Sequence, residues 1–228
     1  MEHFAGGPKV TVVVCTLNEA ENLPHVIPLI PSWVDEVLIV DGRSTDGTVD
    51  LARGLRPDIR ILDQPGRGKG DALKFGVEQA DGEIIVTLDA DGETDPSELA
   101  AFVDAVRGGC DFAKGSRLAR GRPLRMPCYR WVGNKALALT FNILYGARFT
   151  DVCSGYIAFR KSSFLRLGLT YDDCEMEQQM LTRARKLGMA IVEIPHRSDG
   201  RIAGTSKVSG IKQGLIDWLV IIKERFIQ

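Results

Sequence analysis

The chemically most suggestive stretch of the sequence is a short acidic run. Asp89, Asp91 and Glu93 stand within five consecutive positions. Three carboxylates held this close in an extended loop repel one another unless a cation lies between them. Mg²⁺ and Mn²⁺ take oxygen ligands and commonly bridge protein carboxylates to the phosphates of a substrate. We therefore expect Asp89, Asp91 and Glu93 to bind one of these metals, with a solvated acidic loop as the alternative.

A glycine-rich segment offers a second place for a phosphorylated ligand. In residues 66–70, three glycines alternate with Arg67 and Lys69. The glycines allow a close approach of the backbone to a ligand, and the lysine supplies a positive charge. The spacing is not that of a Walker motif. Elsewhere, Asp41 is a carboxylate suited to hydrogen-bonding a nucleobase or a ribose, although turn chemistry alone explains residues 44–48.

Arginines are concentrated in one segment of this nearly neutral protein. The guanidinium group matches the geometry of a phosphate, so this basic segment suits a phosphorylated ligand. Its members are Arg117, Arg120, Arg122, Arg125 and Arg130. Arg201 and Lys207 lie on a later loop of the same kind. For Arg120 and Arg122, solvated surface positions are the alternative.

The order of apolar runs predicts the elements that position these residues. Buried strands are expected at 10–15, 36–40, 59–62 and 84–88, and helices at 20–30, 48–55 and from residue 71 onward. Strands that alternate with helices indicate an α/β fold with a mostly parallel sheet. The polar clusters at 16–19, 41–46 and 89–93 each follow a strand, so they should meet at the carboxyl edge of the sheet.

The second half of the chain is less regular. We expect helices at 134–145 and 174–187, strands at 157–159 and 190–194, and a C-terminal helix. Its apolar stripe comprises Val208, Ile211, Leu215, Ile216, Leu219, Ile222 and Phe226. Core packing is the preferred interpretation of this stripe. Docking on a membrane surface is the alternative, because basic residues flank it, namely Lys207, Lys212, Lys223 and Arg225.

These motifs, in this order, resemble the family-2 glycosyltransferases. The first half of the resemblance consists of Thr16-Leu17-Asn18-Glu19, residues 41–48, Gly68-Lys69-Gly70, Asp89-Ala90-Asp91 and Gly115-Ser116-Arg117. The second half is similar to the polyprenyl-phosphate sugar transferases, through Asp151 with residues 154–156, residues 193–195, and Arg201 with residues 204–207. The resemblance covers about residues 9–210. It implies a GT-A fold with a Rossmann-like central sheet, a nucleotide-sugar donor, Mg²⁺ or Mn²⁺, and inversion at the anomeric carbon.

The resemblance also assigns residues to the donor. It implies that Thr16, Asn18 and Glu19 line the nucleotide pocket, and that Asp41 contacts the base or ribose. Lys69 would approach the base or the phosphates. Asp89, Ala90 and Asp91 would contact the donor, with Asp89 facing the ribose or the metal. Asp91, helped by Glu93, would bind the metal directly.

On the acceptor side, the resemblance implies that Arg117 and Arg130 hold a phosphate, with Lys207 nearby and Asn134 where a serine is usual. Arg117 and Arg201 are assigned to the catalytic group. Asp151 and Glu175 are the preferred acidic residues, with Asp173 and Glu177 as the other candidates. A phosphate acceptor is already an anion and needs no strong base, whereas a hydroxyl acceptor requires one.

Composition excludes some partners and places the chain in one compartment. Lys and Arg total 29 against 30 Asp and Glu, a net charge of −1, which argues against nucleic-acid binding through bulk charge. Five cysteines cannot all pair, so we expect buried, reduced thiols in a reducing compartment. The N-terminus has no signal-peptide pattern. The apolar stretch 215–222 is far below the ~20 residues of a spanning helix.

Together these expectations describe a single GT-A domain spanning residues 1–228. Residues 9–110 form its nucleotide-sugar half, and residues 111–228 form its acceptor half with a C-terminal amphipathic helix. The preferred function is transfer of a hexose from a nucleotide sugar of the GDP-mannose or UDP-glucose type to a polyprenyl phosphate. The location is the cytoplasm, with peripheral membrane contact as an option. A soluble hydroxyl acceptor and a non-catalytic nucleotide-binding protein are the two alternatives.

Overall fold

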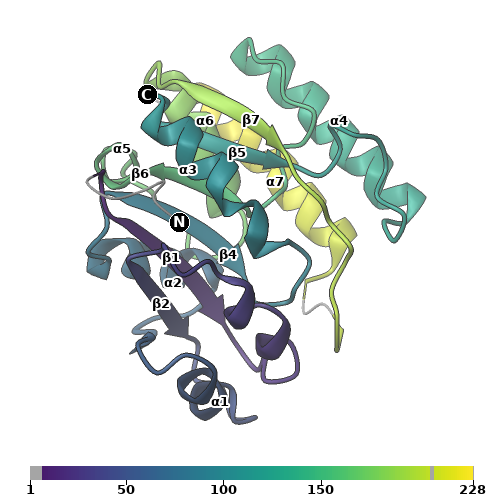
Figure 1. The fold of residues 1–228 in the computed structure, drawn as a ribbon. Coiled ribbons are helices and arrows are strands. Elements are labelled where there is room, and N and C mark those ends of the chain that lie inside the picture. The colour runs from purple at the N-terminus through teal and green to yellow at the C-terminus, as the bar shows by residue number, and fades with distance from the viewer. Residues whose placement is uncertain (1–6, 206–207, 228) are drawn as a thin grey trace.

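A seven-stranded sheet runs through the part of the chain that the computed structural model describes, residues 7–205 and 208–227 (Figure 1). Its strands are β1 (Val10–Thr16), β2 (Glu36–Asp41), β3 (Arg60–Asp63), β4 (Ile84–Asp89), β5 (Phe112–Ser116), β6 (Ile157–Arg160) and β7 (Ile191–Pro195). The order across the sheet is β3-β2-β1-β4-β6-β5-β7. Only β6 runs antiparallel to its neighbours, β4 and β5, so the expected mostly parallel sheet is confirmed.

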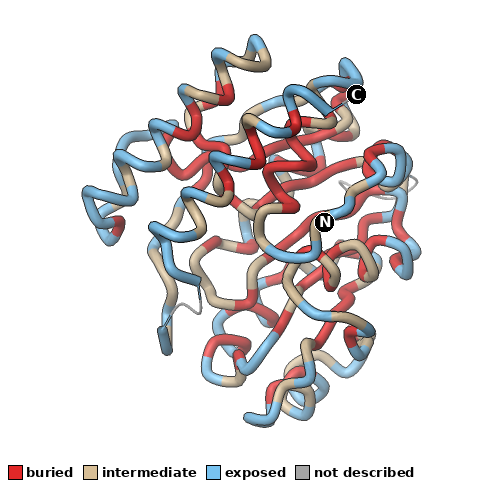
Figure 2. Tube along the Cα trace, turned by 180° about the vertical axis from the view of Figure 1, so that it is seen from behind, coloured by how far each residue is buried: buried red, intermediate tan, exposed pale blue. Residues whose placement is uncertain are grey.

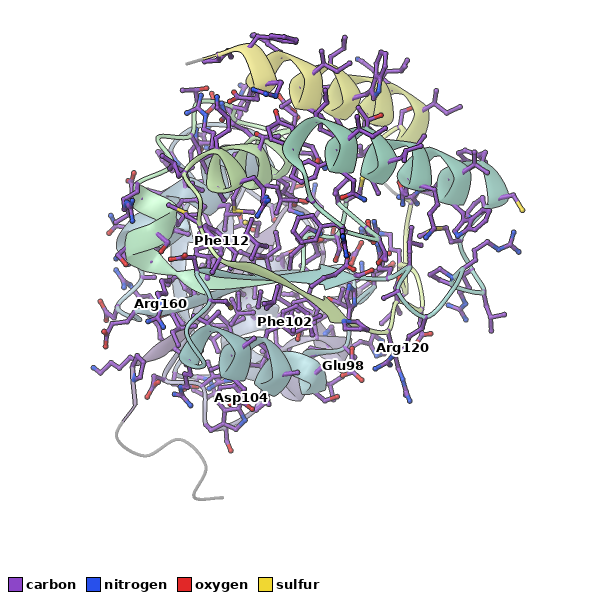
Figure 3. All side chains as sticks on the ribbon, turned by 90° about the horizontal axis from the view of Figure 1, so that it is seen from above. Glu98, Phe102, Asp104, Phe112, Arg120 and Arg160 are labelled. Carbon is purple, nitrogen blue, oxygen red and sulfur yellow. The ribbon has the colours of Figure 1, made fainter. Side chains whose placement is uncertain are left out.

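Helices cover both faces of the sheet, because the strand side chains are apolar on both sides. Val12 and Val14 of β1 join one core cluster, and Val13 joins the other. The helices are α1 (Thr48–Leu55), α2 (Lys69–Gln79), α3 (Leu99–Arg107), α4 (Cys128–Tyr145), α5 (Lys161–Leu165), α6 (Met176–Lys186) and α7 (Gly210–Phe226). Helices α1 and α3 pack in the first cluster, and α2, α5 and α6 in the second. Figure 2 shows the strands buried between these layers, and Figure 3 labels Phe102 and Phe112 on opposite sides of the sheet.

Three segments differ from expectation in or near the first half of the chain. Residues 20–30 form two short 3₁₀ helices, Leu23–His25 and Ile27–Leu29, instead of one α-helix. Pro24 and Pro28 each lie within the first turn of one of these helices, where a proline is tolerated, but neither can lie inside a continuous α-helix. The structure also contains α3 and β5, which the sequence patterns did not predict.

The expected core packing of the C-terminal stripe is wrong. Helix α7 buries Val220 and Ile221, together with Asp217 and Glu224. The stripe residues Ile211, Leu215, Leu219 and Phe226 are exposed, and Ile216 and Ile222 are half-buried. Helix α7 packs against α4 and α6, and it is these two helices that select its buried face.

Two smaller expectations concern cysteines and membranes. All five cysteines are free thiols, as expected, but only Cys110 is buried: Cys15, Cys153 and Cys174 are half-buried, and Cys128 at the start of α4 is exposed. Across residues 7–205 and 208–227, the structure has no helix that combines the length and the apolar character needed to cross a bilayer.

Candidate active site

The carboxyl ends of three neighbouring strands meet at one edge of the sheet. In the strand register, Thr16 of β1 lies beside Asp41 of β2, and Cys15 lies beside Asp89 of β4. The expected convergence of the polar clusters is therefore confirmed. The antiparallel strand β6 brings the segment before Ile157 to this same edge, because Ile157 pairs with Thr87 near the end of β4.

Two loops at this edge are held together by their own polar side chains. The Thr16 hydroxyl donates to Asp41 Oδ1 at 2.9 Å, and the Ser44 amide donates to Asp41 Oδ2 at 2.7 Å. Asn18 adopts a left-handed conformation with φ 52°, and its Oδ1 accepts from the Thr45 amide at 2.8 Å. Thr16 and Asp41 are buried, and Asn18 is exposed. Thr16 and Asp41 thus shape the loops, and their contact with a nucleotide stays a prediction.

Each carboxylate of the acidic loop faces a cation from a distant segment. Lys69 at the start of α2 lies 2.6 Å from Asp89 Oδ1. The Arg201 Nη1 atom lies 3.7 Å from Asp91 Oδ2. The Arg117 Nη1 atom lies 3.4 Å from Glu93 Oε1, which also accepts from the Ser198 hydroxyl at 2.8 Å. Glu93 therefore has two partners of its own, Arg117 and Ser198.

The donor set for a metal is consequently smaller than expected. In the described part of the chain, no group of three or more His, Cys, Asp or Glu side chains is arranged to hold a metal ion. Burial first, and then the negative charge of Asp89, raise the pKa of Asp91 to about 6. This electrostatic conflict fits a divalent cation, which usually takes one or two protein carboxylates plus substrate phosphates.

Lys69 joins the acidic loop to α6. Its Nζ lies 2.7 Å from Glu177 Oε1 as well as 2.6 Å from Asp89 Oδ1. Although burial opposes it, the charges of Asp89 and Glu177 raise the pKa of Lys69 well above its usual value. Glu177 was a secondary candidate in the sequence. It is buried and lines the main cavity, whereas the preferred Glu175 is absent from the described residues that line that cavity.

Asp151 forms a buried ion pair with Arg117. Asp151 is fully buried, and its two oxygens accept from Arg117 Nε at 2.8 Å and Nη2 at 3.2 Å. Although burial alone would raise it, the Arg117 guanidinium holds the pKa of Asp151 well below its usual range. This geometry does not suit a catalytic base that contacts an acceptor. It makes Asp151 the residue that positions Arg117.

Two buried polar residues next to the segment that precedes β6 were not predicted from the sequence. Lys114 of β5 is fully buried, and its Nζ donates to the Ser154 carbonyl at 2.7 Å. His196 lies just after β7, and its Nε2 is 2.9 Å from Ser154 Oγ. The available signal was a lysine within the apolar and small residues 112–116, where no strand was predicted. Both residues fix the segment that precedes β6.

The main cavity, of about 680 Å³, extends from this edge outward between α4 and α7. Its inner end carries charged groups, Lys69, Asp89, Glu93, Arg117 and Glu177. Arg130, Asn134, Gln213 and Asp217 add polar groups to the lining from α4 and α7. The other side chains that these two helices contribute are mainly apolar, namely Tyr129, Leu137, Ile211, Leu215 and Trp218, with Val208 next to them. The cavity thus brings Arg130 and Asn134 into one space with the acidic loop.

The remaining basic residues lie elsewhere. A second hollow of about 550 Å³ is lined by Arg120, Arg122, Arg125 and Arg197. Arg120, labelled in Figure 3, extends from the loop at the edge of the molecule. Arg201 reaches the loop that follows β1, where its Nη2 lies 2.5 Å from Glu19 Oε2. Lys207 lies outside the described residues.

Comparison with known proteins gives consistent matches. Residues 11–168 match the family model described as Glycosyl transferase family 2. Glycosyltransferase AglJ of Haloferax volcanii is 34% identical over 82% of this chain, and the matched region spans 61% of AglJ. Polyprenol monophosphomannose synthase of Mycolicibacterium smegmatis and undecaprenyl-phosphate mannosyltransferase of Micrococcus luteus are each 32% identical over 89% of this chain. The matched regions span 82% and 88% of those proteins.

Among solved structures, the fold matches glucosyl-3-phosphoglycerate synthase from Mycobacterium tuberculosis, in complex with Mn²⁺, UDP and glucosyl-3-phosphoglycerate. The TM-score is 0.74 at 18% identity, and the match covers 97% of this chain and 81% of that one. At this identity the likeness concerns the fold alone.

Proposed function

The chain belongs to glycosyl transferase family 2, and from this membership we propose that it transfers a hexose from a nucleotide sugar to a polyprenyl phosphate, with Mg²⁺ or Mn²⁺. The observation that carries the proposal is the main cavity. Its inner end is charged and its outer wall, between α4 and α7, is mainly apolar. A phosphate attached to a hydrocarbon chain has this same division. A soluble glycan would instead require an outer wall that is mainly polar.

The names of two relatives support the same acceptor. They describe a polyprenol monophosphomannose synthase and an undecaprenyl-phosphate mannosyltransferase. We propose that Arg130 and Asn134, which line the cavity, hold the acceptor phosphate. Arg117 would add positive charge to the cavity through the side of its guanidinium group that faces Glu93. Asp151 fixes the orientation of that group.

On the donor side, Asp89 and Asp91 would hold the metal together with the donor diphosphate. The metal, when bound, would neutralise the charge that develops on the departing nucleoside diphosphate. Lys69 adds a fixed positive charge beside Asp89. Asn18, exposed at the end of β1, is the residue of its loop best placed to meet a nucleotide.

The proposed reaction is a single displacement with inversion. An oxygen of the acceptor phosphate forms a bond to the anomeric carbon. The bond between that carbon and the nucleoside diphosphate breaks, and its electron pair leaves with the diphosphate oxygen. Because the attacking phosphate is already an anion, the reaction needs no general base. The burial of Asp151, which keeps it from acting as a base, is compatible with such a reaction.

The exposed apolar face of α7 supports contact with a membrane surface, where a polyprenyl phosphate resides. Ile211, Leu215, Leu219 and Phe226 are exposed, with Lys212, Lys223 and Arg225 beside them. Helices with apolar and basic faces of this kind bind anionic lipid surfaces. The mouth of the cavity, lined by Ile211 and Leu215, would then open toward the lipid.

The test is a transfer assay with a short polyprenyl phosphate, Mn²⁺, and either GDP-mannose or UDP-glucose. We expect a lipid-linked sugar with one of the two donors, and no product after chelation of the metal. Donor hydrolysis without a lipid product would exclude the lipid acceptor and favour a soluble hydroxyl acceptor. Tight donor binding without turnover on any acceptor would favour the non-catalytic alternative.

A variant locates the acceptor site in the same assay. Arg130 is exposed, so Arg130→Gln should leave the fold intact. We expect the KM for polyprenyl phosphate to rise at least tenfold, because the variant loses a hydrogen bond between charged groups. Donor affinity should be unchanged. Arg120→Gln, on the second hollow, is the matched control. An equal loss of donor affinity in Arg130→Gln would contradict the assignment of Arg130 to the acceptor.

A further inference from the structure

Each carboxylate of the acidic loop shares its cation with a second carboxylate outside the loop. Three cationic side chains follow this pattern. Lys69 bridges Asp89 in the loop to Glu177, Arg201 bridges Asp91 to Glu19, and Arg117 bridges Glu93 to Asp151. The loop that would bind a divalent metal thus already has monovalent cations as counterions. Of the three, Lys69 is bound most evenly.

The Lys69 bridge is short on both sides. Its Nζ lies 2.6 Å from Asp89 Oδ1 and 2.7 Å from Glu177 Oε1. An ammonium group has three donors, so it can serve two carboxylates at once. The bridge is covered by Gly155, where an added Cβ would lie 2.8 Å from Lys69 Nζ and 2.9 Å from Glu177 Oε1. No larger residue fits over the bridge at that position without displacing it.

The backbone fixes Lys69 relative to Glu177 independently of the ion pair. In the first turn of α2, the Asp71 amide donates to the Asp172 carbonyl at 2.9 Å. Gly70 approaches the same segment so closely that an added Cβ would lie 2.8 Å from the Asp172 carbonyl carbon. Helix α6, which carries Glu177, begins four residues later at Met176. Glu177 therefore stays within reach of Lys69 whatever Asp89 binds.

We infer that Lys69 is the built-in counterion of Asp89 that a divalent cation displaces, and that Glu177 is the positioning residue that retains Lys69 when this happens. The inference rests on the proposed metal-dependent function. Asp89 can pair with Lys69 or bind the metal, so Lys69 competes with the metal. Glu177 offers Lys69 a second partner and thereby weakens that competition.

The test measures Mn²⁺ affinity without nucleotide or activity, from the electron paramagnetic resonance signal of free Mn²⁺. Lys69→Met removes the competitor, so we expect Mn²⁺ to bind about tenfold more tightly, which corresponds to about 1.4 kcal/mol. Glu177→Gln leaves Lys69 with Asp89 as its charged partner, so we expect Mn²⁺ to bind several-fold more weakly. Lys69→Gln, which keeps a hydrogen-bond donor between the carboxylates, is the second variant should Lys69→Met fail to fold, and is also expected to tighten binding.

The double variant separates a positioning role from a general effect of charge. If Glu177 acts through Lys69, Glu177→Gln has no further effect once Lys69 is methionine. A loss of affinity that is equally large in both backgrounds would show that Glu177 acts on the metal directly, and the inference would be wrong.

Two controls distinguish this failure from failure of the proposed metal site. Lys74→Met removes the same charge from the same helix, where Lys74 pairs with Asp172 at 2.6 Å, and is expected to leave Mn²⁺ affinity unchanged. Asp91→Asn is expected to abolish Mn²⁺ binding. If Mn²⁺ binds neither wild type nor Lys69→Met, whether GDP or UDP is absent or present, the metal site itself is wrong and the inference falls with it. If Mn²⁺ binds wild type and Lys69→Met equally, only the inference is wrong.

Discussion

His196 shows how a single buried residue ties the site to pH. Its Nδ1 lies 2.7 Å from the Arg197 carbonyl and its Nε2 lies 2.9 Å from Ser154 Oγ. A carbonyl only accepts, so Nδ1 carries the proton and Nε2 accepts from the serine hydroxyl. This arrangement requires a neutral ring. Burial is the main reason that the pKa of His196 is lowered to about 4.

The consequence for stability has a definite sign. An unfolded histidine titrates near pH 6.5, above the value of about 4 in the folded protein, so the unfolded state binds more protons between these limits. The His196 contribution is complete above pH 6.5 and is lost as pH falls toward 4. We expect His196→Gln to flatten the fall in the free energy of unfolding between pH 7 and 5 by about 1–2 kcal/mol, measured by urea denaturation. Exposed His25→Gln is the control, and an unchanged slope in His196→Gln would refute the assignment.

Among the helices, α7 carries the clearest expectation about partners. Leu215 and Leu219 are 59% and 60% exposed on the face that flanks the cavity mouth. We expect Leu215→Asp with Leu219→Asp to reduce sedimentation with vesicles of phosphatidylglycerol and phosphatidylcholine at least tenfold, because two buried leucines contribute about 3 kcal/mol or more. Leu29→Asp changes a leucine that is 53% exposed in the 3₁₀ helix Ile27–Leu29 and serves as the control. Equal sedimentation of all three proteins would exclude α7 as a membrane contact.

The same helix shows where sequence reasoning stops. Strand ends such as Thr16, Asp41 and Asp89 were predictable, because runs of buried β-branched residues end where polar groups begin. The buried face of α7 was not predictable, because apolar residues lie on more than one side of it. Contacts with α4 and α6 then decide which of these residues are covered. In such cases the amphipathic pattern alone does not identify the core.

At the site, the same limit separates residue type from residue position. The acidic loop and Lys69 were predictable from their types and from the strand before them. That Glu177, and not Glu175, faces Lys69 was not predictable. The docking of α6 on α2 decides which acidic residue faces Lys69. The burial of Asp151 was likewise invisible, since it depends on Arg117 and on the strand order.

For the whole molecule, the net charge of −1 conceals an uneven distribution of charge. Carboxylates and cations alternate across the site. A donor that binds there specifically should raise the free energy of unfolding, because it binds the folded state alone. A donor at 100 times its Kd raises the free energy of unfolding by about 2.7 kcal/mol. For a chain of this length each kcal/mol corresponds to about 2–4 °C in Tm. We expect either GDP-mannose or UDP-glucose, with Mn²⁺, to raise Tm by about 5–10 °C. Mannose 1-phosphate is the control, and no shift with either donor would contradict the donor site.

Helix α3 packs across β4, β5, β6 and β7, and so bridges the boundary between the strands of the proposed donor side and those of the proposed acceptor side. Its buried side chains, Leu99, Phe102, Val103 and Val106, lie in the same core cluster as β1 and β4. A hinge between the two sides would have to break this apolar contact. The enzyme therefore cannot exclude water by closing one lobe over another. In the proposed reaction, the lipid acceptor and the sugar donor would themselves cover a surface that is already assembled.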